Sequence, residues 1–169
     1  PPRTAPALQS PPLQKPRPYS PKAGFKAPEL FSAVATEATA KLSTFISQEL
    51  VNMVWAYSTM GVRAFSLFAA VALEAPKLMS SYNAQNLAKT AWAFATAGAD
   101  APLLFHALAL EALKKMPTFN SQDLANTVWA YSTARSHSAD LFRAVARESL
   151  KKLETFNPQN LANTVWAFA

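Results

Sequence analysis

The sequence predicts an all-α protein, an α-solenoid of about four 37-residue helix-pair repeats with a disordered N-terminal tail. The first observation is the spacing of the tryptophans, each of which lies 37 residues after the last: Trp55, Trp92, Trp129 and Trp166. The second is that apolar residues within a unit recur at the spacing of one helical face. The third is that nine of the 13 prolines fall within residues 1–28, where they deny the backbone its helical hydrogen bonds.

The predicted tail spans residues 1–26, which contain five basic residues and no acidic residue. This segment has no apolar periodicity, and its proline content favours polyproline II conformation over packed structure. Two interpretations stay open for it. It is either a plain linker or the remnant of an organelle transit peptide, a class that is poor in acidic residues.

The repeat region spans residues 27–169, with units at 27–63, 64–100, 101–137 and 138–169, the last of them incomplete. Several positions besides tryptophan keep the same register. In the first unit they are Phe31, Glu37, Phe45, Gln48 and Leu50, and identical or similar residues follow 37, 74 and 111 positions later. Chance matches do not keep that many columns in phase, so each unit is predicted to be one copy of the same helix pair.

The first helix of each unit is predicted to begin near Pro28, Pro102 and their equivalents, because proline is favoured in the first helical turn. Leu30 and Val34 are spaced as neighbours on one face of such a helix. Pro76 lies inside the first helix of the second unit. Since proline removes a hydrogen bond and clashes with the preceding turn, that helix is predicted to be kinked or shortened.

The second helix of each unit has clear predicted ends. Its N-cap residues are Asn83, Asn120 and Asn157. Asp123 follows Asn120 by three residues, which is the spacing of a capping box. Gly61 and Gly98 follow the equivalent helices and are predicted to end them in the left-handed conformation.

Two polar columns of the second helix are candidate base-reading positions, because amide, carboxylate and ammonium groups hydrogen-bond to base edges. The first column is Asn52, Lys89, Asn126 and Asn163, and the second is Glu49, Asn86, Asp123 and Asn160. We expect them beside a column of small alanines on an accessible face. Ordinary solvation is the alternative for both columns. Capping is a further alternative for the second column, so the first is preferred.

The tryptophans allow two interpretations. A helical wheel places Trp129 beside Leu124 and Val128 on a broad apolar face, which favours core packing for the whole column. A platform for stacked bases is the alternative.

Basic residues gather at the end of the first helix. Lys77, Lys114 and Lys151 are candidate phosphate contacts. Lys115 and Lys152 lie four residues after Glu111 and Glu148, a spacing that favours a structural ion pair.

The composition argues against an enzyme, a metal site or a bound cofactor. There is no cysteine, glycine occurs only three times, and His106 and His137 share no column. No second titratable group recurs beside the glutamate column, as acid–base catalysis would need. The longest apolar runs are too short for a membrane helix. The net charge of +6 resides mostly in the tail, so the repeats are nearly neutral.

The segments FNSQDLANTVWAYS and FNPQNLANTVWAFA, at residues 119–132 and 156–169, resemble the octotricopeptide repeats. The 37-residue period is closer still to the heptatricopeptide repeats of organellar proteins, which often carry a C-terminal RAP domain. The resemblance implies a solenoid that binds single-stranded RNA in a mitochondrion, or alternatively a plastid, and affects RNA stability, processing or translation. Lys89 departs from the motif, and residues 1–169 include no RAP domain, which leaves open whether further repeats or a RAP domain follow Ala169. A protein–protein scaffold remains the alternative function, because helix-pair solenoids also bind peptides.

Overall fold

The computed structural model describes residues 27–169, and all regular structure in that range is helical. The helices are α1 (Pro28–Lys41), α2 (Ser47–Met60), α3 (Phe65–Glu74), α4 (Ala84–Ala97), α5 (Pro102–Lys115), α6 (Ser121–Thr133), α7 (Ala139–Lys152) and α8 (Pro158–Phe168). Corresponding helices begin 37 residues apart. The predicted all-α repeat architecture is therefore confirmed, while the predicted disordered tail at residues 1–26 lies outside the described residues.

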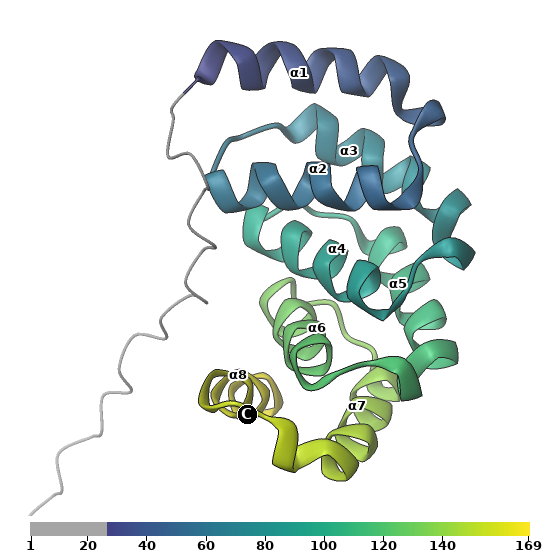
Figure 1. Cartoon of the computed structure of the whole chain (residues 1–169), viewed down its shortest axis with the longest axis vertical. Helices are drawn as coiled ribbons and strands as arrows, with labels where there is room; N and C mark the ends of the chain where they lie inside the picture. The colour runs from purple at the N-terminus through teal and green to yellow at the C-terminus, as the bar shows by residue number, and fades with distance from the viewer. Residues whose placement is uncertain (1–26) are drawn as a thin grey trace, which may run out of the picture.

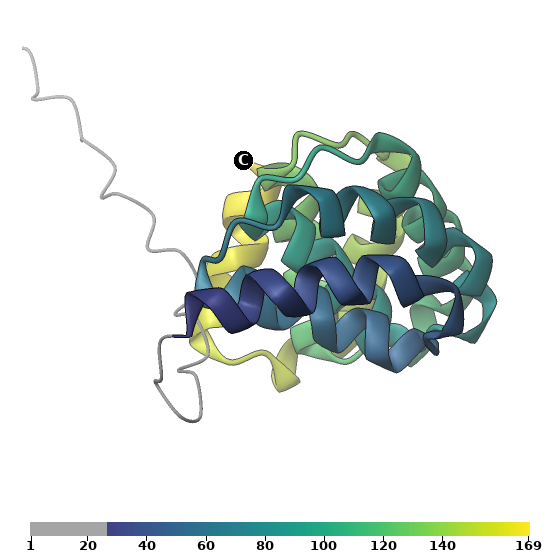
Figure 2. The same ribbon diagram turned by 90° about the horizontal axis from the view of Figure 1, so that it is seen from above.

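The helices form two layers, with α1, α3, α5 and α7 in one and α2, α4, α6 and α8 in the other (Figures 1 and 2). Successive second helices pack side by side far more extensively than successive first helices do. Buried alanines such as Ala91, Ala93 and Ala130 allow this close approach. Because the units are closest together in the second-helix layer, that layer forms the inner side of the stack.

The predicted caps of the second helices are confirmed. The side chains of Asn83, Asn120 and Asn157 each accept a hydrogen bond of 2.8 Å from the backbone N–H three residues later. Gly61 and Gly98 end α2 and α4 in the left-handed conformation, with φ of 66° and 65°. These local signals therefore set the length and phase of the inner helices.

Pro76 shortens α3, as predicted. That helix ends at Glu74 after 10 residues, whereas α1, α5 and α7 each have 14. A seven-residue 3₁₀ segment, Ala75–Ser81, replaces the missing turns. The other units have 3₁₀ segments of only three residues at this place.

An edge-to-face aromatic pair joins the two helices of every unit. The ring centroids of Phe105 and Tyr131 are 5.0 Å apart, and equivalent pairs occur in the other three units. In the first and third units, the tyrosine hydroxyl also donates a 2.6 Å hydrogen bond to the backbone carbonyl of its phenylalanine partner. This pair fixes how each first helix is seated on its second helix.

Lysines tie neighbouring units together. Lys152 of the fourth unit donates hydrogen bonds of 2.8 and 2.7 Å to the carbonyls of Pro117 and Phe119 in the third unit. The Glu148 carboxylate holds the same ammonium at 2.9 Å. Lys115 makes the equivalent contacts with the second unit and with Glu111. The structural role expected for this lysine column is thus a link between units.

Candidate nucleic-acid interface

Each second helix presents one narrow stripe of residues on the inner layer, and the polar members of that stripe are accessible. The stripe holds glutamine, then asparagine or lysine, then tryptophan, then threonine, at spacings of four, three and four residues. Its members are Gln48, Asn52, Trp55 and Thr59; Gln85, Lys89, Trp92 and Thr96; Gln122, Asn126, Trp129 and Thr133; and Gln159, Asn163 and Trp166. We call this set the inner stripe. Because the second helices are stacked in parallel, it runs across all four units as rows of equivalent side chains.

The first candidate column lies on the inner stripe. Asn52 is exposed, and Lys89, Asn126 and Asn163 are half-buried. Their side chains reach solvent beside the tryptophan row. The structure therefore leaves this column available to a ligand.

The second candidate column lies between the helices. Asn86, Asp123 and Asn160 are buried, at 3, 6 and 6 % exposure. Glu49 is exposed, and its carboxylate accepts a 2.9 Å hydrogen bond from the backbone N–H of Ile46 at the start of α2. Asp123 likewise accepts one from the backbone N–H of Asn120, at 3.2 Å. Glu49 and Asp123 thus cap their helices, and burial removes the other members of this column from the accessible surface.

The alanine column was expected on an accessible face, but its two middle members are inaccessible, while Ala56 and Ala167 are half-buried. Ala93 and Ala130 are fully buried. A second helix has a neighbouring second helix on each flank, so its buried sector is wider than the single apolar face of a surface helix. The alanines lie in one of these flanking contacts.

Three tryptophans of the inner stripe form a ladder beneath its polar side chains. Trp92 and Trp129 have ring centroids 6.3 Å apart, and Trp129 and Trp166 are 6.5 Å apart. Trp92 and Trp129 are each 8 % exposed, so the core role predicted for these two is confirmed. Burial leaves little of either ring open to a base. The ladder consequently supports the polar side chains rather than offering open faces to bases.

Lys89 has a position of its own in the stripe. Its ammonium lies over the Trp55 ring, 5.7 Å from the centroid, in a cation–π contact between the first and second units. Burial raises the pKa of Asp123, and the backbone N–H of Asn120 and the charges of Lys89 and Lys152 oppose that rise. Lys89 thus supplies the positive charge nearest the centre of the stripe.

The glutamine column is a candidate that sequence reasoning missed. All four glutamines are exposed, and the Gln48 Nε2 donates a 3.0 Å hydrogen bond to the Asn52 Oδ1. The signal was available, because each glutamine lies four residues before the preferred asparagine or lysine and so shares its helical face. A pair of polar side chains, not one, therefore faces a ligand in every unit.

The predicted phosphate contacts lie along one edge of the array. Lys77, Lys114 and Lys151 are highly exposed, and each pairs with the glutamate three residues before it at 2.7–2.9 Å. Lys114 and Lys151 lie at the ends of α5 and α7, and Lys77 lies in the 3₁₀ segment after α3, so each shortly precedes the N-terminus of a second helix. The lysine side chains are 67–70 % exposed, so their ammonium groups stay accessible to a phosphate.

The described residues contain no cluster of three or more histidine, cysteine, aspartate or glutamate side chains that would suit a metal ion. Within residues 27–169, no helix has the length and apolar character needed to cross a membrane.

One family model matches the chain, that of the RNA-editing substrate-binding complex 6 protein, over residues 20–169. Among curated proteins, none matches the chain in sequence. The family match supports an RNA-related helical protein. The narrower resemblance to octotricopeptide and heptatricopeptide repeats stays a prediction.

Proposed function

We propose that this chain, which belongs to the RNA-editing substrate-binding complex 6 family, binds single-stranded RNA along the inner stripe. The observation that carries the proposal is the recurrence of an accessible glutamine with an asparagine or lysine above the tryptophan ladder, once per unit, on parallel helices. One set of contacts per unit is how helical-repeat proteins read successive bases.

The chemistry of the stripe suits unpaired bases. Asparagine and glutamine amides each offer a donor and an acceptor, so they can pair with a base edge that presents both. Lys89 offers donors only, which favours an edge with acceptors such as the O6 and N7 of guanine. The edge lysines Lys77, Lys114 and Lys151 contact the phosphates, and the second-helix N-termini beside them add positive potential.

We also propose that the protein acts without catalysis, in a mitochondrial RNA-editing assembly. The inner stripe has Lys89 as its sole titratable member, whereas acid–base catalysis needs paired groups. The family name supports the editing context. In this role the repeats hold an RNA for other components, which would influence its processing or stability.

A protein–protein scaffold is the second candidate. The repeat region carries 11 basic and 10 acidic residues, a near-neutral balance that suits a protein partner. Salt distinguishes the two functions. RNA affinity should fall steeply as salt rises, because lysines that neutralise phosphates release counterions.

The test compares two double variants. An RNA selected from a randomised single-stranded pool by the parent protein is titrated by fluorescence anisotropy. We expect Gln122→Ala with Asn126→Ala to weaken binding about tenfold or more, since each lost base contact contributes roughly 1 kcal/mol. Ser32→Ala with Thr36→Ala on the exposed face of α1 should change nothing. Equal affinities of the two double variants would refute the proposal.

A further inference from the structure

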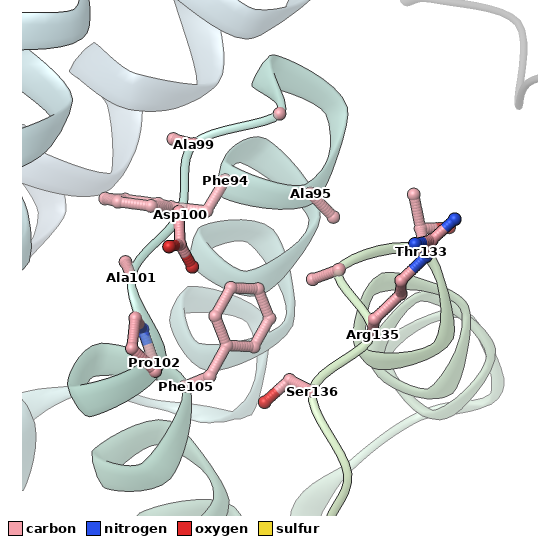
Figure 3. Close-up of a pocket in the computed structure, with 12 residues that line it drawn as sticks. Phe94, Ala95, Ala99, Asp100, Ala101, Pro102, Phe105, Thr133, Arg135 and Ser136 are labelled. Carbon is pink, nitrogen blue, oxygen red and sulfur yellow. The ribbon is translucent and has the colours of Figure 1, made fainter.

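Two cavities of the same construction lie at consecutive junctions, where a second helix ends and the next first helix begins. One of about 310 Å³ lies between the first and second units, and one of about 260 Å³ lies between the second and third (Figure 3). Every residue that lines the first cavity has its counterpart, 37 residues on, in the lining of the second. These cavities are therefore a property of the repeat, and they lie at the edge opposite the row of exposed lysines.

The two cavities differ in charge. Arg63 lines the first, and Asp100 lines the second at the equivalent position. Both are exposed, and neither takes part in an ion pair within residues 27–169. Figure 3 shows the Asp100 carboxylate directed into the second cavity, whereas Arg135 extends away from it at the far rim. The first cavity therefore favours an anionic group and the second a cationic group.

Spacing adds a second constraint on a ligand. Packed helices lie about 8–10 Å apart, so neighbouring junctions are separated by about that distance. A peptide in polyproline II conformation rises about 3.1 Å per residue and returns to the same side every third residue. Side chains three residues apart on such a peptide would therefore enter neighbouring cavities.

We propose that this edge binds an extended segment of a partner protein, with an acidic and a basic side chain three residues apart. The acidic side chain occupies the cavity of Arg63 and the basic one that of Asp100. An RNA strand fits less well, because its uniformly negative backbone would be repelled at Asp100. The site goes beyond the proposed RNA surface and adjoins it at Thr96 and Thr133, which line the cavities and end the inner stripe.

The test uses the full chain and two labelled nine-residue peptides in a serine–proline background. One places glutamate three residues before lysine, and the other reverses that order. The parent protein should bind one peptide about tenfold more tightly than the other at low salt. Reversing the peptide order turns two exposed attractive ion pairs, at Arg63 and Asp100, into two repulsive ones. The exchange variant Arg63→Asp with Asp100→Arg, which keeps the net charge, should prefer the other order.

RNA affinity provides the control, because the exchanged residues lie outside the inner stripe and should leave it unchanged. Two results would overturn the proposal: the same peptide order preferred by both proteins, or no binding of either peptide. Loss of RNA affinity in the exchange variant without any peptide binding would assign the edge to the nucleic-acid surface instead. Circular dichroism and thermal melting of the variant establish that it is folded before the comparison.

Discussion

At the scale of single residues, Arg135 occupies a position that Gly61 and Gly98 fill in the preceding units. All three have positive φ, and Arg135 has φ of 53°. A residue with a side chain loses roughly 1–2 kcal/mol of stability in the left-handed conformation. Replacing it with glycine recovers only part of this, because glycine loses more conformational entropy on folding. We expect Arg135→Gly to raise the free energy of unfolding by about 0.5–1 kcal/mol in urea titrations. Gly98→Ala should lower it, and a loss of stability in Arg135→Gly would contradict this account.

Lys89 is the second informative residue, because it is the one member of its column that is not asparagine. Lys89→Asn should change the preferred base at one position of the selected RNA and leave the others unchanged, since the variant gains an acceptor. The salt dependence should fall by at most about one phosphate contact. Parallel selections from randomised RNA with parent and variant measure both effects. An identical motif in the two selections would remove Lys89 from base recognition.

At the scale of helices, the tryptophan ladder connects the second helices of neighbouring units. Trp129 contacts both neighbours in the ladder, whereas Trp166 contacts Trp129 and is half-buried. Trp129→Ala should therefore destabilise the protein by about 3–5 kcal/mol, and Trp166→Ala by less. Urea titrations followed by circular dichroism give both values. If Trp129→Ala unfolded like the parent but lost RNA affinity, direct base stacking would replace the supporting role.

The contact between the third and fourth units should make stability depend on pH. Glu148 holds the ammonium group of Lys152, which donates hydrogen bonds to backbone carbonyls of the third unit. Hydrogen bonds from Lys151 and Lys152 hold the pKa of Glu148 below its ordinary value of 4.5. A lowered pKa means that the carboxylate stabilises the fold above the unfolded-state pKa, and that this contribution is lost as pH falls through the folded-state pKa. Glu148→Gln should thus lower the urea midpoint by more at pH 7 than at pH 3. Glu154→Gln, at an exposed glutamate, is the control, and a pH-independent difference for Glu148→Gln would count against the link.

The helix boundaries were accessible to sequence reasoning because their causes are local. The N-cap asparagines, Gly61, Gly98 and Pro76 each act on the turn in which they occur, and the structure bears out the effect expected of each. The burial of Asp123 and Ala130 was not accessible, because it depends on a neighbouring helix on each flank of α6. A helical wheel shows which residues share a face, but it does not show how many neighbours cover the helix.

At the scale of the whole molecule, different surfaces suit different partners. We propose RNA on the inner stripe, phosphate contacts at the edge with the exposed lysines, and a peptide at the opposite edge. The first-helix layer contributes only at these two edges, through Lys114 and Lys151 at one and the starts of α3 and α5 at the other. A repeat region with almost no net charge can bind a polyanion in this arrangement, because its exposed lysines lie together along one edge.

The most direct test is to map where RNA touches the protein. The chain is crosslinked by ultraviolet light to a single-stranded RNA containing 4-thiouridine, and the crosslinked peptides are identified by mass spectrometry. The account predicts crosslinks within α2, α4, α6 and α8, centred on stripe residues such as Gln85, Lys89 and Asn126. Crosslinks confined to α1, α3, α5 and α7 would contradict the claim that the inner stripe is the RNA-binding surface.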